Sequence, residues 1–207
     1  MPTAPERATA CQKCPVLCWS RTQIVAPDFP GLDRPCRVLV IGEAPGADED
    51  VQGKGFVGRA GRILHALLEA YGLRRGQDYG CANIVRCRPP ENRRPTAIEI
   101  RHCLPYLAEA IERAQPQAVL TVGETATRAI TGIRGLSENI RFLAEHGQDP
   151  KRAEMLYLPE IRRAWPEGTR LFPMPHTSPL AWNRNAPDGR KWAVVGVEQV
   201  QRMVDAL

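Results

Sequence analysis

Residues 36–42 have the sequence Cys-Arg-Val-Leu-Val-Ile-Gly, a short apolar run that ends in glycine. A run of this length with β-branched residues predicts a strand buried within a sheet. A polar loop follows from Glu43 to about Gly58. Apolar residues then recur at helical spacing over 63–71, and Gly72 marks the expected end of that helix. This strand–loop–helix unit decides the fold, because it recurs along the chain.

The later units follow the same pattern. Residues 81–86 predict a second strand, and residues 118–123 predict a third strand with a helix behind it. A long helix is expected from Thr96, since Thr96 and Glu99 have the spacing of a capping box. Pro105 falls inside this helix and predicts a kink or a break.

Repeated units of this kind predict an α/β fold with three αβα layers and a central, mainly parallel four-stranded sheet. The 207 residues, 43% of them hydrophobic, suffice for one domain. Segment 132–171 has weak periodicity and is treated as a possible insertion, and residues 192–207 predict a terminal helix. The loops after Gly42, Arg86 and Pro173 should meet at the carboxyl ends of the strands, where such sheets bind ligands.

The net charge of +5 is compatible with a partner made of phosphates, such as DNA. No apolar run approaches the roughly 18 residues that a membrane span needs. The first ten residues lack the apolar core of a secretory signal. A cytoplasmic protein, monomeric and without a membrane partner, is therefore expected.

The chain has seven cysteines. In a reducing cytoplasm, clustered cysteines favour metal ligands or redox groups over disulfides. Two separated pairs have suitable spacing: Cys11 with Cys14, and Cys87 with Cys103. Four such thiolates suit a [4Fe–4S] cluster or a structural zinc ion, and the alternative is a set of unrelated buried thiols. Cys18 competes with Cys14 for a ligand position, whereas Cys36 and Cys81 fall in expected strands and should belong to the core.

Two loops carry candidate catalytic groups. In residues 42–61, glycines that allow a ligand close to the backbone stand beside four carboxylates within residues 43–50. A solvated acidic loop is the alternative, but the position directly after a buried strand favours a ligand site. Residues 172–180 hold His176 among prolines. A lone histidine is usually structural, yet one on a rigid loop at the sheet edge is a better candidate than most.

Together these motifs resemble the family-four uracil-DNA glycosylases, the branch of the uracil-DNA glycosylase superfamily that carries an iron–sulfur cluster. The motifs stand in that family's order: Glu43-Ala-Pro-Gly46 with Phe56-Val-Gly-Arg-Ala-Gly61, then Asn83-Ile-Val-Arg-Cys-Arg-Pro-Pro90, then His176-Thr-Ser-Pro-Leu180. The resemblance covers roughly residues 8–130 and 170–190. It implies a [4Fe–4S] cluster rather than zinc, held by Cys11, Cys14, Cys87 and Cys103. The cluster is expected to be structural and to tie an N-terminal arm at about 8–20 to the long helix.

The resemblance also implies a reaction, in which a base is flipped out of DNA and its N-glycosidic bond is hydrolysed to leave an abasic site. In such an enzyme Phe56 stacks on the flipped base and Asn83 binds its Watson–Crick edge. His176 stabilises the oxygen of the departing anionic base, and the backbone N–H of Gly46 helps to hold that base. The resemblance thus assigns catalysis and base binding to residues of three separate segments.

Two further sets of residues complete the expected site. Many relatives in the wider superfamily have an aspartate at the position of Ala44, so the carboxylate that orients water is expected to be Glu43 first and Glu49 second. Phosphate contacts, which supply affinity without sequence specificity, are assigned to polar and basic residues of the neighbouring loops. These residues are Arg86, Arg88, Arg93, Arg94, Ser178 and Arg184.

The sequence departs from the family pattern at three places near the pocket: Gly55 and Thr177 stand where prolines are usual, and segment 132–171 is longer than the usual connection. Uracil is the first choice of substrate. The alternative is a bulky modified base, such as glucosylated hydroxymethylcytosine in phage DNA, whose excision would serve antiviral defence. A non-catalytic DNA-binding module and an electron-transfer protein are further alternatives, against which the joint presence of Phe56, Asn83 and His176 argues.

Overall fold

The computed structural model describes residues 11–31, 36–156 and 158–207. One four-stranded sheet forms its centre, with the strand order β2-β1-β3-β4 and every neighbouring pair parallel. The strands are β1 (Val38–Gly42), β2 (Tyr79–Asn83), β3 (Ala118–Val122) and β4 (Arg170–Met174). The predicted fold class is confirmed, and the sheet is parallel throughout. Residues 8–10 of the expected N-terminal arm lie outside the described residues.

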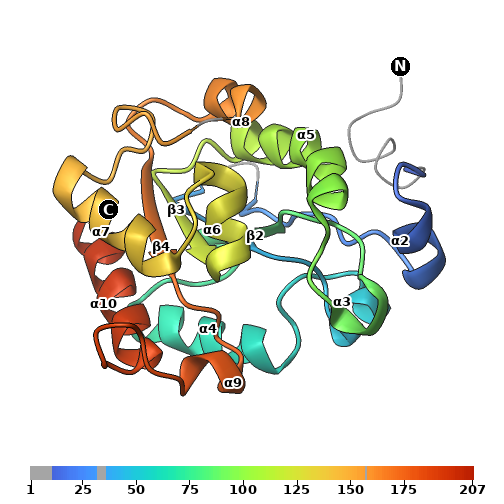
Figure 1. The fold of residues 1–207 in the computed structure, drawn as a ribbon, viewed down its shortest axis with the longest axis horizontal. Coiled ribbons are helices and arrows are strands. Elements are labelled where there is room, and N and C mark those ends of the chain that lie inside the picture. Colours follow the sequence, from blue (N-terminus) through green and yellow to red (C-terminus); the bar gives the residue numbers. More distant parts are fainter. Residues whose placement is uncertain (1–10, 32–35, 157) are drawn as a thin grey trace.

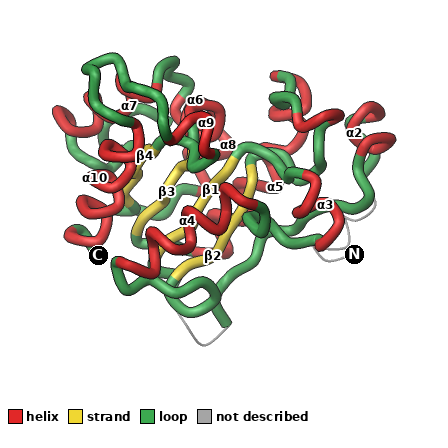
Figure 2. Tube along the Cα trace, turned by 90° about the horizontal axis from the view of Figure 1, so that it is seen from below, coloured by secondary structure: helices red, strands yellow, loops and turns green. Residues whose placement is uncertain are grey.

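Helices cover both faces of the sheet, as Figure 1 shows with α5, α6 and α8 on one side and α4 and α9 on the other. Figure 2 shows the strands side by side, with α4 in front of the sheet. The helices are α2 (Pro15–Ser20), α3 (Ala47–Gln52), α4 (Arg59–Ala70), α5 (Ala97–Ala114), α6 (Glu124–Thr131), α7 (Leu136–His146), α8 (Pro159–Ala164), α9 (Pro179–Trp182) and α10 (Trp192–Asp205). Within the described ranges, no helix is long and apolar enough to cross a membrane.

The side chains of β1 alternate between the two cores, as the period of two of a strand requires. Leu39 and Ile41 pack in the core that includes α5 and α6. Val38 and Val40 pack in the second core, with α4 and α10. The strand is buried at all five positions, which explains why its sequence is a continuous apolar run rather than an alternating one.

Helix α5 begins as its sequence predicts. Thr96 is its N-cap, the Thr96 hydroxyl accepts a hydrogen bond from Glu99 N at 3.3 Å, and the Glu99 carboxylate accepts one from Thr96 N at 2.7 Å. The helix continues through Pro105 to Ala114, so a break at the proline is not observed. Proline removes one backbone hydrogen bond, but Leu104 and Leu107 beside it are buried in the core, and this packing supports the helix on both sides of the proline.

Segment 132–171 is an ordered part of the domain. It forms α7 and α8 and leads into β4, with α7 packed on β4 and α8 packed on α5. Trp165 is almost fully buried, and its indole N–H donates to Thr169 O at 3.0 Å. Asn139 is buried as well and donates to the carbonyls of Ile133 and Gly135. The segment therefore covers the edge of the sheet that carries β4.

Candidate active site

A cavity of about 610 Å³ opens at the carboxyl ends of the strands. Each strand contributes to its lining at or just after its last residue: Glu43 follows β1, Asn83 ends β2, Gly123 follows β3, and His176 stands two residues beyond β4. Parallel strands place all these positions at one edge of the sheet, which is where open α/β sheets bind ligands. The convergence of loops that the sequence predicts is therefore present.

Gly42 lies beneath the ring of Phe56 and the amide of Asn83. Gly42 and Asn83 are register partners in β1 and β2. A Cβ atom at Gly42 would lie 2.6 Å from Asn83 Oδ1 and 2.6 Å from Phe56 Cζ, closer than real Cβ atoms approach. The glycine thus permits an aromatic face and an amide to meet at one point of the cavity, an arrangement that fits a flat polar ring.

The amide of Asn83 is half-buried and lines the cavity. Across the described residues, no hydrogen bond is formed by its side chain. An asparagine amide carries two donor hydrogens and one acceptor oxygen. Both kinds of group at Asn83 are available to a ligand.

The backbone of Phe56 has a left-handed conformation, with φ of 58°. This conformation is costly for an aromatic residue, by about 1–3 kcal/mol, and persists only where the surroundings hold it. Arg75 Nη2 donates to Gly55 O at 2.6 Å, and His65 Nε2 lies 2.9 Å from Phe56 O. Arg75 and His65 therefore contact the carbonyl oxygens of Gly55 and Phe56, and these contacts support the backbone at the stacking ring.

Arg75 and His65 are in turn positioned by residues of strand β2 and of the segment before β1. Arg75 Nε donates to Asp28 Oδ2 at 2.8 Å, and Asp28 Oδ1 accepts from Cys81 N at 2.9 Å. His65 Nδ1 is 2.8 Å from the Tyr79 hydroxyl. Burial, and then the neighbouring Arg75, lower the pKa of His65, so the ring is neutral. Its Nε2 lies close both to Phe56 O and to Arg75 Nη1, at 2.9 Å and 3.0 Å. The sequence analysis missed all these residues, because they belong to no motif and meet only in the folded chain.

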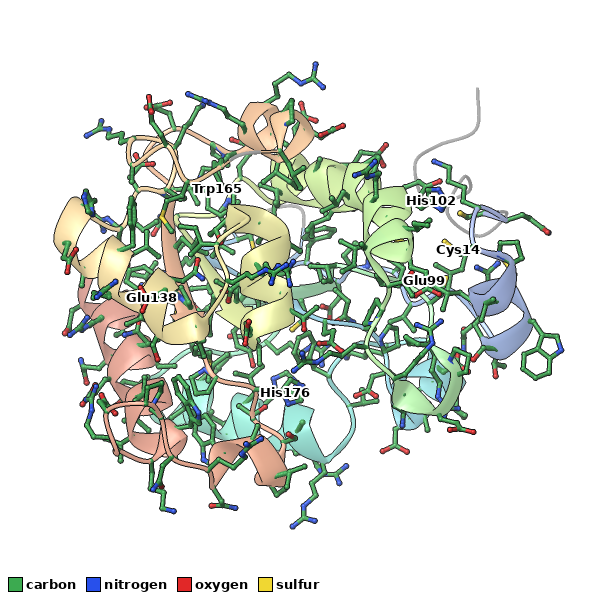
Figure 3. The ribbon with its side chains drawn as sticks, in the orientation of Figure 1. Cys14, Glu99, His102, Glu138, Trp165 and His176 are labelled. Carbon is green, nitrogen blue, oxygen red and sulfur yellow. The ribbon has the colours of Figure 1, made fainter. Side chains whose placement is uncertain are left out.

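His176 is held by its own loop. Its Nδ1 accepts a hydrogen bond from Ser178 N at 3.0 Å, which requires Nδ1 to be unprotonated and leaves the proton of a neutral ring on Nε2. Burial lowers the pKa of His176, and the charge of Glu43 opposes this shift in part. Its ring packs against Gly123, which has φ of 94° and whose added Cβ would lie 3.3 Å from His176 Cβ. His176 is therefore a neutral donor that lines the cavity (Figure 3).

The two candidate carboxylates differ in what their oxygens do. Glu49 accepts hydrogen bonds from the backbone N–H groups of Gly46 (3.0 Å), Val57 (2.9 Å) and Gly58 (2.8 Å). It clamps the loop, and it also occupies the Gly46 N–H that the sequence analysis assigned to the base. The carboxylate of Glu43 has no hydrogen-bond partner among the described residues and lies close enough to affect His176. The geometry gives Glu49 a structural role and leaves Glu43 to face the cavity.

Of the residues expected to bind phosphate, Arg93, Arg94 and Ser178 line the cavity, whereas Arg88 and Arg184 do not. Arg93 forms a two-pronged ion pair with Glu99, at 2.7 Å and 2.9 Å. This pair lowers the pKa of Glu99 to about 2. Glu99 therefore neutralises much of the charge of Arg93, and Arg94 is the more exposed cation of the two.

The prediction for Arg86 is wrong. Its side chain is buried rather than presented to DNA, and its guanidinium donates to Tyr106 O and stacks 5.1 Å from the centre of the Tyr106 ring. It lies at the cysteine-rich corner of the molecule, where its charge lowers the pKa of Cys103 against the effect of burial. Arg86 belongs to a segment rich in arginines, and this position in the sequence does not indicate that its side chain points into the protein.

The four predicted cysteine ligands gather where α2, α5 and the loop after β2 meet. Cys14, Cys87 and Cys103 are buried, and Cys11 is half-buried. Burial and then the charges of Cys103, Glu99, Cys11 and Cys87 raise the pKa of Cys14 to about 11, so the other three cysteines lie within electrostatic reach of Cys14. No group of three or more His, Cys, Asp or Glu side chains in the described part of the chain is close enough to hold a single metal ion.

The chemistry of this corner fits a thiolate-bound cluster. Arg21 Nη1 donates to Cys87 Sγ at 3.0 Å, and Cys14 Sγ lies 3.4 Å from His102 Nδ1 (Figure 3 shows Cys14 beside His102). Hydrogen bonds to sulfur and nearby cations stabilise thiolates, which burial alone would disfavour. In a [4Fe–4S] cluster each thiolate binds a different iron, so the ligands stand farther apart than around one ion.

The remaining cysteines have other surroundings. Cys36 and Cys81 are buried in the core, as predicted from their strand positions. Cys18 is half-buried and its thiol donates to Cys11 O at 3.6 Å. The thiol of Cys18 is thus engaged with backbone, and it is not among the thiols that raise the pKa of Cys14.

Comparison with known proteins identifies relatives of the chain. A family model described as the uracil DNA glycosylase superfamily matches residues 29–197. The chain is 38% identical over 126 residues to the type-4 uracil-DNA glycosylase of Pyrobaculum aerophilum, across 60% of this chain and 61% of that protein. It is 38% identical over 171 residues to the type-4 uracil-DNA glycosylase of Archaeoglobus fulgidus, across 75% of this chain and 83% of that protein. A type-5 uracil-DNA glycosylase of Pyrobaculum aerophilum is 30% identical over 203 residues, across 86% and 82% of the two chains.

Proposed function

The chain belongs to the uracil DNA glycosylase superfamily, in its type-4 branch, and from that membership we propose that it removes uracil from DNA by hydrolysing the N-glycosidic bond. The observation that carries the proposal is the meeting of Phe56, Asn83 and His176 around one cavity at the carboxyl edge of the sheet. These residues supply a stacking face, an unengaged amide and a neutral N–H donor. They are the three groups that recognition and departure of a flipped pyrimidine require.

Binding comes first in the proposed mechanism. A base inside a duplex is out of reach, so the nucleotide is flipped into the cavity, where Phe56 stacks on the ring. The amide of Asn83 pairs with the uracil edge: its oxygen accepts from N3–H and its NH₂ donates to O4. Because Gly42 brings the ring and the amide together from below, a flat pyrimidine can meet both at once.

The bond between C1′ and N1 then breaks, and its electron pair leaves with the base. Negative charge develops on the uracil O2, and the sugar acquires oxocarbenium character. His176 donates its Nε2–H to the anionic oxygen, a preorganised donor being worth most where charge develops. Glu43 orients a water molecule, accepts one of its protons as the water oxygen bonds to C1′, and so completes an abasic site.

Two features of the cavity favour uracil over a bulky modified base. None of the described residues of segment 132–171 lines the cavity, so the described part of that segment offers no contact to a substituent on the base. Thr177 is buried, and its hydroxyl donates to Ala60 O at 2.7 Å, which holds the histidine loop in place of the missing proline. The relatives named above are likewise uracil-DNA glycosylases, and they give no support to antiviral excision or to a non-catalytic role.

We further propose that Cys11, Cys14, Cys87 and Cys103 hold a [4Fe–4S] cluster. When bound, the cluster supplies a structural link between the start of α2, the loop after β2 and α5, since glycosidic hydrolysis transfers no electron. Arg21 supports this assignment by its hydrogen bond to Cys87 Sγ. DNA is the partner, and the arginines and serine around the cavity bind its phosphates.

The test is an incubation of the purified protein with oligonucleotides that contain uracil, thymine or cytosine at one position, followed by alkali to cleave abasic sites. Cleavage at uracil alone is expected, together with release of free uracil. A parallel incubation with DNA that contains glucosylated hydroxymethylcytosine distinguishes the other substrate. Release of the modified base without release of uracil would overturn the proposal.

A further inference from the structure

A second cavity of about 330 Å³ lies between α5 and α6, beside the candidate active site. The two cavities share three lining residues: Arg94, Glu124 and Thr125. One wall of residues therefore separates them. No step of the proposed reaction uses this second cavity.

Three arginines line the second cavity: Arg94, Arg101 and Arg128. All three are exposed, and none forms a salt bridge within the described residues. Glu124 is the acidic residue of the lining, and its Oε1 accepts a hydrogen bond from Gly135 N at 3.2 Å. The cavity therefore has an excess of positive charge that the protein itself does not neutralise.

The floor of the cavity is apolar. Side chains from α5, α6 and the residue before α8 form it: Ile100, Leu104, Ala129 and Leu158. A site for phosphate alone needs cations but no apolar floor. An apolar floor under a cationic rim matches a nucleotide, whose base and sugar lie on the floor while its phosphate meets the rim.

We propose that this cavity binds one unstacked nucleotide of the DNA strand next to the flipped one. The proposal rests on the proposed function, because a strand whose nucleotide enters the first cavity must leave over its rim. Arg94 and Thr125 line both cavities, so a strand that leaves the first cavity past these residues reaches the second. A volume of about 330 Å³ is at the low end for ligand cavities, which suits a single base with its sugar and not a duplex.

The subsite has a consequence for the substrate. A flanking base can enter the cavity only if it is unpaired, so a single-stranded or frayed flank binds without the cost of opening a second base pair. The strand is held by Arg101 and Arg128, which do not line the first cavity. Their contribution is therefore to affinity for the strand and not to bond breaking.

The experiment uses single-stranded oligonucleotides with one uracil and, at one neighbouring position at a time, an abasic spacer or a neutral methylphosphonate linkage. With the unaltered protein, removal of the base at one particular neighbouring position should raise KM by roughly 10- to 100-fold, the range for loss of one buried apolar group. The Arg101→Gln/Arg128→Gln double variant should raise KM for the unmodified strand, and the methylphosphonate at that position should then have no further effect. The slope of log KM against log salt should fall by roughly 0.7 for each phosphate that the variant no longer neutralises.

The Arg74→Gln/Arg202→Gln double variant is the matched control, since both are exposed arginines that line neither cavity and their loss also removes two positive charges. Equal KM values for the double variant and this control, or equal effects of spacers at every position, would overturn the subsite. The same series measured as binding of strands that lack uracil keeps the test independent of catalysis. Absence of uracil release by the unaltered protein would refute the proposed function and leave this binding test in force.

Discussion

The catalytic cavity and the cysteine corner occupy separate parts of the molecule, as the positions of His176 and Cys14 in Figure 3 show. The cavity is built from groups that the protein itself holds ready: Ser178 N fixes the tautomer of His176, and Arg75 supports the backbone before Phe56. The cysteine corner gathers thiols whose pKa values burial raises. Burial keeps these thiols neutral, and the proposed cluster would bind them as thiolates, which couples metal binding to folding.

The two regions should therefore affect different properties: the cavity should affect the reaction rate, and the cysteine corner should affect the stability of the fold. A residue of the cavity contributes one hydrogen bond or one stacking contact to the transition state, so its removal should slow the reaction and leave the fold intact. A ligand of the corner connects distant segments, so its removal should unfold the chain before it affects chemistry. Each of the following changes tests whether the reaction rate and the stability of the fold depend on separate residues.

The largest effect is expected for Cys103→Ser. A structural metal site contributes on the order of 10 kcal/mol to folding, which is comparable to the whole stability of a domain. The variant should lose iron and most of its soluble yield. The measurement is iron content and thermal unfolding after anaerobic purification, for which the unaltered protein should be brown.

Cys18→Ser is the control for this variant, because Cys18 is on the same arm but outside the proposed ligand set. Its iron content and melting temperature should match those of the unaltered protein. Loss of iron from Cys18→Ser with full retention in Cys103→Ser would reverse the assignment, and stoichiometric zinc in place of iron would refute the cluster.

His176→Ala should lower kcat by roughly 10²- to 10³-fold, the range for loss of one preorganised donor to an oxyanion. The melting temperature and DNA affinity should change little. His176→Gln, which retains a side-chain donor, should recover part of the rate. Single-turnover kinetics on a uracil oligonucleotide measure both variants, and an unchanged kcat in His176→Ala would mean that another group stabilises the leaving base.

A smaller effect is expected for Arg75→Met, which removes the donor to Gly55 O and the ion pair with Asp28. Phe56 can then relax from its left-handed backbone, at a cost of about 1.4 kcal/mol in transition-state binding, or about tenfold in kcat/KM. Arg75→Lys should recover part of this loss. Arg74→Met is the control on an exposed neighbouring arginine, and an equal loss in both would show a general charge effect rather than support of Phe56.

The smallest effect concerns pH. Because burial lowers the pKa of His176 below the ordinary histidine value of about 6.5, the ring stays neutral as the pH falls through 6.5. At still lower pH, protonation of Nδ1 would turn it into a donor, and the hydrogen bond that it accepts from Ser178 N would be lost. The profile of kcat should therefore be flat from pH 8 to pH 6.5 and decline only below, and a decline centred at or above 6.5 would contradict the neutral donor.

Many features of this fold and site follow from the sequence, since they depend on neighbours along the chain. The apolar run before Gly42 and the capping box at Thr96 are local patterns, and both form the elements that they predict. Motif residues at strand ends, such as Asn83 and His176, converge because a parallel sheet brings its carboxyl ends together. The strand pattern thus indicated which loops would meet, and the family resemblance indicated which of their side chains would share a cavity.

The use of each polar group depended on contacts between distant segments. In the sequence, Glu49 and Glu43 are equivalent candidates, because both are carboxylates of one loop. In the folded chain, three backbone N–H groups donate to Glu49. Arg86 turned inward to Tyr106, although its sequence neighbours gave no reason for it. A hydrogen bond forms only where folding places donor and acceptor within about 3 Å of each other, so such assignments are decided by packing.

The sequence by itself determined the α/β order of elements and the cysteine pairs, because periodicity and spacing are properties of the chain, and its motifs indicated the residues around the candidate active site by resemblance to a family. Tertiary structure alone decided the tautomer of His176, the support behind Phe56 and the second cavity between α5 and α6. Each of these arises from side chains far apart in sequence whose distance, burial and charge exist only once the two faces of the sheet are covered.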